Sequence, residues 1–169
     1  SNTLTLTDIE SITGDSGNDA ITLGSALVGD IDLAAGTDSL TLANGVNTLN
    51  VANVETITGN SGADTIALTT AITGGNFNLG AGTDTVTLLS ASAANSLSAT
   101  GIETLTGSTG DDTITMGGVI TGAVYDLGSG TDIITLTSGT NSITASNVET
   151  VTGGTGADAV TFGASISGA

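Results

Sequence analysis

The sequence predicts an all-β fold, a parallel β-solenoid (β-roll or β-helix) made of repeats of about 46 residues. Three observations support this fold class. The chain repeats the same short motifs at regular intervals, it contains 26 glycines and no proline, and its apolar residues alternate with threonine, asparagine and serine. A period of two matches strands, whose side chains point alternately to opposite faces, and does not match a helix. We therefore expect the 169 residues to form one solenoid segment.

A glycine turn followed by a strand-like run defines the repeat. It reads TGDSGNDAITL in the first copy and returns as TGNSGADTIAL, TGSTGDDTITM and TGGTGADAVTF. A second motif, such as LGAGTDTVTL, lies between these copies, and a third motif begins at Asn2, Asn47, Asn95 and Asn141. The predicted repeats are residues 2–46, 47–94, 95–140 and a partial copy at 141–169.

Each repeat contains five short strand-like segments. The aspartates of its two glycine turns are 19 or 20 residues apart within a repeat and 26 to 28 residues apart between repeats. This alternation predicts coils of two strands that alternate with coils of three strands. If all the glycine turns stack on one edge of the solenoid, their aspartates form a single file. The seven aspartates are Asp19, Asp38, Asp64, Asp84, Asp112, Asp132 and Asp158.

The charge of the chain restricts its partners. The sequence has 17 acidic residues and no lysine, arginine or histidine, so its formal net charge is −17. Nucleic acids and anionic membrane surfaces attract basic proteins, and we exclude both as partners. No apolar run approaches the roughly 20 residues of a membrane-spanning helix, which argues against membrane insertion. Two stacked carboxylates about 5 Å apart repel by roughly 3 kcal/mol at an effective dielectric of about 20, so protons or bound cations must neutralise them.

The glycine turns resemble a known calcium-binding repeat. GDSGNDAIT, GNSGADTIA, GSTGDDTIT and GGTGADAVT are similar to the nonapeptide of the repeats-in-toxin (RTX, haemolysin-type) family, as is LGAGTDTVT of the second motif. The resemblance implies a parallel β-roll that holds calcium between successive turns through turn aspartates and backbone carbonyls. It also implies that the apolar residue two places after each aspartate lies in the core. Spacer strands separate the nonapeptides, and Asp15, Asn60 and Ser108 stand where the family has its second glycine, so the chain resembles a divergent, long-repeat form of the family.

The resemblance makes the seven turn aspartates the side-chain ligands of calcium, the only cofactor that we expect. Hard oxygen donors suit this ion, whereas the absence of histidine and cysteine argues against zinc, copper and iron. Possible backbone or secondary ligands in the first motif are Gly14, Ser16, Gly17, Gly59, Ser61, Gly62, Gly107, Thr109, Gly110, Gly153, Thr155 and Gly156. The second motif and the residues before it add Gly36, Gly82, Gly130, Asp32, Asn78 and Asp126.

Two features of the acidic residues have an alternative interpretation that needs no ion. A turn aspartate directly before a strand also binds backbone amides, as in ordinary turn chemistry. Glutamates recur four residues before the first turn glycine of each repeat, where they are either solvated or additional ligands. These glutamates are Glu10, Glu55, Glu103 and Glu149.

The same features predict a structural protein and not an enzyme. A pair of carboxylates suffices for glycoside hydrolysis, but a catalytic site occurs once, whereas most acidic residues here recur in another repeat. We expect a calcium-stabilised segment of a large secreted or cell-surface bacterial protein, such as an S-layer, an extracellular filament or an adhesin stalk. Its partners would be calcium ions and, end to end, further repeats of the same chain or neighbouring subunits. Two alternatives remain open: a calcium-dependent secretion or folding module attached to a secreted toxin or enzyme, and a threonine-rich solenoid that binds ice or another surface.

Overall fold

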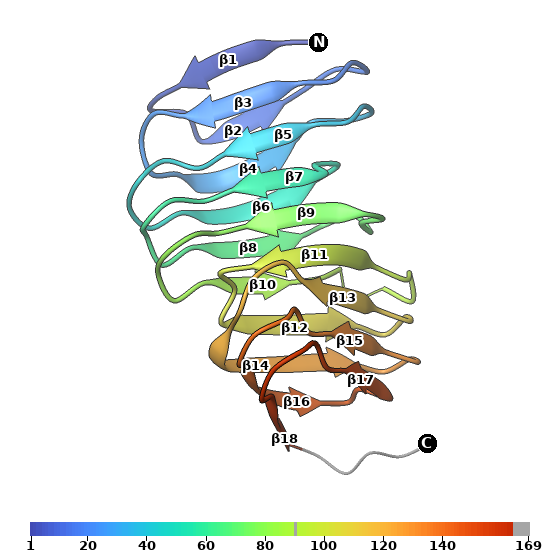
Figure 1. Cartoon of the computed structure of the whole chain (residues 1–169). Helices are drawn as coiled ribbons and strands as arrows, with labels where there is room; N and C mark the ends of the chain where they lie inside the picture. Colours follow the sequence, from blue (N-terminus) through green and yellow to red (C-terminus); the bar gives the residue numbers. More distant parts are fainter. Residues whose placement is uncertain (90, 164–169) are drawn as a thin grey trace.

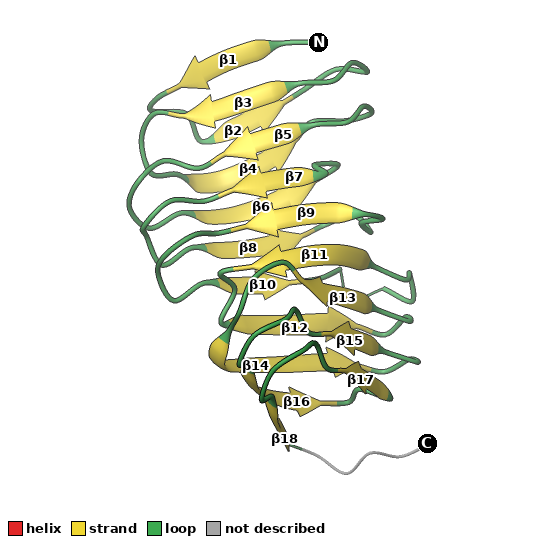
Figure 2. Ribbon diagram, in the orientation of Figure 1, coloured by secondary structure: helices red, strands yellow, loops and turns green. Residues whose placement is uncertain are grey.

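The computed structural model describes residues 1–89 and 91–163, so the end of the partial fourth repeat, 164–169, lies outside the described residues. The predicted fold class is confirmed: the described chain is a parallel β-solenoid with 18 strands and no helix (Figures 1 and 2). The strands stack in chain order, and β1 and β18 lie at opposite ends (Figure 1). Within the described ranges, no helix is long and apolar enough to cross a membrane.

The strands form two parallel sheets of nine, which we call the odd sheet and the even sheet. The odd sheet contains β1 (Thr3–Leu6), β3 (Ala20–Leu23), β5 (Ser39–Thr41), β7 (Thr56–Thr58), β9 (Gly75–Asn78), β11 (Ser96–Thr100), β13 (Thr113–Met116), β15 (Ile133–Thr135) and β17 (Thr150–Thr152). The even sheet contains β2 (Ser11–Thr13), β4 (Val28–Asp32), β6 (Thr48–Ala52), β8 (Thr65–Leu68), β10 (Thr85–Thr87), β12 (Thr104–Ser108), β14 (Thr121–Gly128), β16 (Ser142–Ser146) and β18 (Ala159–Phe162).

Each coil places one strand in the odd sheet and the next strand in the even sheet. Thr3 pairs with Ala20, and Ala20 pairs with Ser39, so the first two coils are 17 and 19 residues long. The prediction of five strands per repeat is confirmed, since residues 2–46 hold β1 to β5. Each coil of the structure holds two strands. The predicted groups of two and three strands in a repeat therefore fill two and a half coils. Because five is odd, each repeat begins on the sheet opposite to the one where the previous repeat began.

This change of sheet divides the turn aspartates between the two edges of the solenoid. Asp19 and Asp38 precede odd strands, whereas Asp64 and Asp84 precede even strands. The third repeat returns to the first edge, and Asp158 lies on the second. The prediction of a single file was therefore wrong, because it assumed that every repeat starts on the same edge.

The core lies between the two sheets and consists of the inward residues of every strand. The apolar residue two places after the turn aspartate is buried in six of the seven glycine turns, as expected, and Val160 is partly buried. Phe77 and Tyr125 are the largest side chains that are fully buried. Most other core residues are leucine, isoleucine and valine, which fit a thin interior about 10 Å across.

Candidate functional site

A row of side chains, most of them polar and buried or partly buried, runs along each edge of the solenoid, close to where the strands begin. We call these rows the odd ladder and the even ladder, after the strands that follow them. In chain order, the odd ladder is Asn2, Asp19, Asp38, Glu55, Ile72, Asn95, Asp112, Asp132 and Glu149. The even ladder is Glu10, Leu27, Asn47, Asp64, Asp84, Glu103, Ile120, Asn141 and Asp158. Both ladders repeat the order apolar, Asn, Asp, Asp, Glu.

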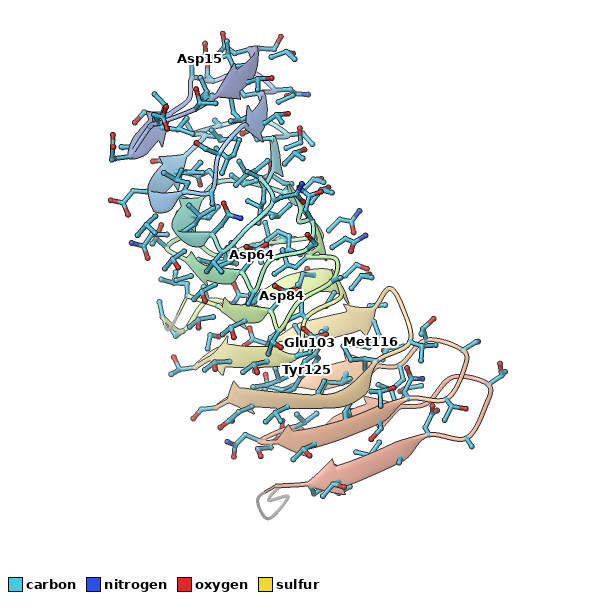
Figure 3. All side chains as sticks on the ribbon, turned by 90° about the vertical axis from the view of Figure 1, so that its left-hand side faces the viewer. Asp15, Asp64, Asp84, Glu103, Met116 and Tyr125 are labelled. Atoms are coloured by element: carbon cyan, nitrogen blue, oxygen red, sulfur yellow. The ribbon has the colours of Figure 1, made fainter. Side chains whose placement is uncertain are left out.

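Backbone amides join the successive members of each ladder. The N–H of Asp64 donates to Oδ1 of Asp84 at 2.7 Å, and the N–H of Asp84 donates to Oε2 of Glu103 at 2.8 Å (Figure 3). The equivalent bonds recur on the odd ladder, at 2.6–2.7 Å from Asp19 to Asp38 and from Asp38 to Glu55. From the second coil onward, each Asn, Asp or Glu side chain of a ladder thus accepts a hydrogen bond from an amide one coil earlier, which satisfies a donor that the turn would otherwise bury unpaired.

Asparagine starts each polar run. Oδ1 of Asn47 accepts the N–H of Leu27 at 3.0 Å. The side-chain amide oxygen thus takes the acceptor role that a carboxylate oxygen has elsewhere in the ladder. The backbone N–H and Nδ2 of Asn47 both donate to Oδ1 of Asp64, each at 2.9 Å. Asn95 binds Asp112 in the same way. Asparagine therefore stabilises the first carboxylate of each run with two hydrogen bonds.

The sequence interpretation identified the aspartates of the ladders but missed the asparagines and underestimated the glutamates. Asn47, Asn95 and Asn141 are buried, at most 1% exposed. Glu55, Glu103 and Glu149 are partly buried and accept ladder hydrogen bonds instead of being simply solvated. The signal was present, because both residue types recur at a fixed position in every repeat.

The ladder aspartates are buried without any basic side chain in the chain to balance them. Asp19, Asp38, Asp64, Asp84, Asp112 and Asp132 are at most 2% exposed. Desolvation raises the pKa of Asp84 to about 6, and the carboxylates of Asp64 and Glu103 add to this effect. Desolvation likewise raises the pKa of Asp132 to about 6, with contributions from Asp112 and Glu149. The pKa of Asp38 is also raised, mainly by desolvation.

Asp19 and Asp158, the first aspartates of the first and last runs, have pKa values shifted in the opposite direction. Burial raises the pKa of Asp19, but hydrogen bonds from Asn2 and Asp15 outweigh burial and lower it overall. Hydrogen bonds from Asn141 lower the pKa of Asp158. Since these hydrogen bonds favour the ionised form, the negative charge of Asp19 and of Asp158 is stabilised next to the asparagine of its run.

The second carboxylate oxygen has a partner in two of the first aspartates, Asp112 and Asp19. Oδ2 of Asp112 accepts the N–H of Ser108 at 2.8 Å, and Oδ2 of Asp19 accepts the N–H of Asp15 at 3.3 Å. Among the described residues, four buried oxygens accept no hydrogen bond. They are Oδ2 of Asp38, Asp64, Asp84 and Asp132. This group contains all three second aspartates and one first aspartate, Asp64, whose Oδ1 accepts two hydrogen bonds from Asn47.

The calcium ligands implied by the RTX resemblance can be tested against this geometry. The aspartates do not form one file, and their Oδ1 atoms already accept amide hydrogen bonds. A Cβ at Gly36 would lie 2.7 Å from the carbonyl oxygen of Gly17, and a Cβ at Gly82 would overlap the carbonyl oxygen of Gly62. These glycine carbonyls therefore face the backbone of the next coil, where the resemblance would place an ion.

The remaining expected ligands do not complete a calcium site. Oδ1 of Asp32 accepts the N–H of Ala34 and Nδ2 of Asn53, and Oδ1 of Asp126 accepts Nδ2 of Asn147. Asn78 is exposed at the end of β9. No three acidic groups converge in the part of the chain that the structure describes. The residues present do not fit a calcium ladder, so the expectation of bound calcium rests on the RTX resemblance alone.

The two sheets and the two ladders together define a solenoid repeat protein in which each coil is fixed to the next through backbone and side-chain hydrogen bonds. Comparisons with known protein families, with curated proteins and with solved structures find no match.

Proposed function

We propose that this chain is a structural segment, a stiff rod within a large secreted or cell-surface protein such as an S-layer, a filament or an adhesin stalk. The observation that carries the proposal is the pair of ladders, which repeat the same hydrogen bonds through the stack. A repeat that joins itself to its neighbours in this way extends a rod with each added copy. The extracellular part of the proposal is supported by the resemblance of the glycine turns to RTX repeats.

The function is tested by lengthening the rod. A second copy of residues 47–94, inserted before Asn95, preserves the natural order of repeats because each repeat starts on the opposite edge. Two and a half coils at about 4.8 Å each should lengthen the particle by about 12 Å without changing its width. Small-angle X-ray scattering measures this change, and a glycine–serine insert of the same length is the control. A particle that widens instead of lengthening would contradict the rod.

One observation favours a second candidate, the binding of ice or another ordered surface. On the odd sheet, four threonines lie in register on consecutive strands and face outward: Thr5, Thr22, Thr41 and Thr58. A parallel row of small residues lies two positions earlier: Thr3, Ala20, Ser39 and Thr56. Strand spacing of about 4.8 Å and side-chain spacing of about 6.6 Å make these rows a regular grid of methyl and hydroxyl groups.

The second candidate is tested by thermal hysteresis and by inhibition of ice recrystallisation. Lysines at Thr22 and Thr41 should abolish either activity, because they interrupt the grid. Lysines at the exposed Val28 and Val124 add the same charge to the even sheet and serve as the control. A wild-type chain without activity in both assays would exclude ice binding and leave the rod proposal intact.

A further inference from the structure

The second aspartate of each run is a buried charge that lies between two other carboxylates. Asp38, Asp84 and Asp132 are at most 1% exposed, and each lies between an aspartate one coil earlier and a glutamate one coil later. Oδ1 of each accepts an amide hydrogen bond, whereas Oδ2 accepts none among the described residues. A buried carboxylate oxygen without a donor destabilises the folded state, since it has lost its hydrogen bonds to water and makes none inside the protein.

We propose that each Asp–Asp–Glu run binds one proton on its second aspartate, at Oδ2 of Asp38, Asp84 and Asp132, and that the rod is thereby more stable in weak acid than at neutral pH. A protonated carboxyl is a hydrogen-bond donor at one oxygen and an acceptor at the other. The bound proton removes the central charge of each run and leaves the amide hydrogen bond to Oδ1 in place.

The asparagines of the same ladders show that a neutral donor suits this position. Asn47 and Asn141 end the turns LANGVN and LTSGTN, and Asp84 and Asp132 end the similar turns LGAGTD and LGSGTD. Nδ2 of Asn47 donates to the carbonyl oxygens of Ala43 at 3.0 Å and Gly45 at 3.2 Å. Nδ2 of Asn141 donates to the carbonyl oxygen of Thr137 at 2.8 Å. A protonated aspartate has the same arrangement of one acceptor and one donor as these amides.

The charged groups that face the second aspartates are almost all acidic. Asp84 faces Asp64 and Glu103. Asp132 faces Asp112, Glu149 and Asp111. Asp38 faces Glu55, Asp19 and Asp15. The chain has no basic side chain, and the amino group of Ser1 lies 4.0 Å from Asp15 and Asp19, at the far end of the first run.

The direction of the pH effect follows from the pKa shifts. The pKa of Asp84 and of Asp132 is about 6 in the folded chain, above the ordinary value of 3.8. Between these two values the folded chain binds more protons than the unfolded chain. The stabilisation is therefore complete below pH 3.8 and is lost as the pH rises through about 6. Asp19 and Asp158, whose pKa values are lowered, act in the opposite direction only in stronger acid.

Thermal unfolding of the full chain tests the proposal, measured by circular dichroism from about pH 4.5 to 8 at constant ionic strength with EDTA present. The wild-type melting temperature should rise by roughly 5 °C or more on acidification across this range. The variant Asp38→Asn/Asp84→Asn/Asp132→Asn should melt higher than the wild type at neutral pH and should lose the pH dependence. The control variant Asp8→Asn/Asp30→Asn/Asp126→Asn removes three exposed charges and should keep it.

Two results would overturn the proposal. One is a wild-type melting temperature that does not rise in weak acid, and the other is a ladder variant that responds to pH as strongly as the control. If the ladder variant does not fold, carbon-13 NMR of the wild-type aspartate carboxyl groups decides the question. The carboxyls of Asp84 and Asp132 should titrate near pH 6 and that of Asp38 above its ordinary value, and titration of all three near 3.8 would exclude the bound protons. Neither failure affects the rod proposal, which depends on the stacking of coils.

Discussion

The backbone N–H of Asp64 donates to Oδ1 of Asp84, so an amide links two buried aspartates whose charges repel each other. Figure 3 shows Asp64, Asp84 and Glu103 following one another along one side of the stack. A ladder aspartate therefore has two separate effects on stability. Its oxygen stabilises the fold as a hydrogen-bond acceptor, whereas its buried charge destabilises the fold. Substitutions can remove one effect and keep the other.

Substitution of Asp64 tests the acceptor. In Asp64→Ala, the backbone N–H and Nδ2 of Asn47 both lose their acceptor inside the protein, and we expect a loss of about 2–4 kcal/mol in the free energy of unfolding. Asp64→Asn keeps an oxygen at the same position and should cost less than half as much. Urea denaturation followed by circular dichroism measures both variants. Equal losses would show that the charge, and not the acceptor, matters.

Substitution of Asn47 tests the start of a run. Asn47→Asp replaces the donor Nδ2 by an oxygen next to Oδ1 of Asp64, so an attractive contact at 2.9 Å becomes a repulsive one. We expect a loss of about 2 kcal/mol or more at neutral pH, with partial recovery near pH 5 as the added carboxyl takes up a proton. The exposed Asn44 lies in the same turn, and Asn44→Asp adds the same charge as a control. A recovery in acid of similar size for both variants would contradict the explanation.

Much of the fold could be predicted from the sequence, but the edges of the solenoid could not. Alternation of apolar residues and the glycine turns are local signals, and they correctly predicted strands, repeats and inward residues such as Ile66. The spacing of 26 residues from Asp38 to Asp64 has two solutions, one long coil or one and a half short coils. Only the pairing of strands decides between them, and strand pairing is a long-range property.

The candidate site was predicted in part for a similar reason. The aspartates could be predicted as site residues because a carboxylate that recurs in an apolar repeat without basic residues must be neutralised or hydrogen-bonded. Asn95 carries no charge, so the same reasoning does not identify it. Its side chain nevertheless donates to Oδ1 of Asp112 and accepts the N–H of Ile72. The partners of Asn95 lie in the neighbouring coils, 17 and 23 residues away in the sequence, so its role becomes visible only when the coils are stacked.

Contact between successive glycine turns predicts a strong steric requirement at Gly62. A Cβ at this position would overlap the carbonyl oxygen of Gly45 in the preceding coil. Gly62→Ala must therefore push two coils apart, and we expect a loss of at least about 3 kcal/mol. At Gly118, a Cβ would lie 3.2 Å from the terminal methyl group of Thr100, which can move, so Gly118→Ala should cost less than about 1 kcal/mol. Similar losses for both variants in urea denaturation would contradict the close contact.

Calcium removal tests the RTX resemblance directly. Because the ladder oxygens and the glycine carbonyls already face backbone groups, we expect EGTA to change the melting temperature by less than about 2 °C. Circular dichroism before and after the addition of millimolar calcium provides the measurement, with magnesium as the control for ionic strength. A large rise that is specific to calcium would support the secretion or folding module and would require a turn geometry different from the one described.

Tyr125, the only tyrosine of the chain, reports on the integrity of the core. Its hydroxyl donates to the carbonyl oxygen of Ile102 at 2.9 Å, and its side chain is fully buried. Burial, with a smaller contribution from Glu103, raises the pKa of the phenol above its ordinary value of 10.0. The stabilisation from the neutral phenol is therefore present below pH 10 and is lost as the pH rises further.

In the folded rod, the phenol of Tyr125 should stay neutral under alkaline conditions that ionise a free tyrosine, and phenolate absorbance should rise only as the strands melt. Simultaneous recording of ultraviolet absorbance and circular dichroism in an alkaline titration checks this coupling. Tyr125→Phe leaves the carbonyl of Ile102 without its donor and should cost about 1 kcal/mol, while removing the absorbance change altogether. Phenolate that forms before the strand signal falls would show that the hydroxyl is accessible to solvent and that the two sheets are packed less tightly around Tyr125 than described.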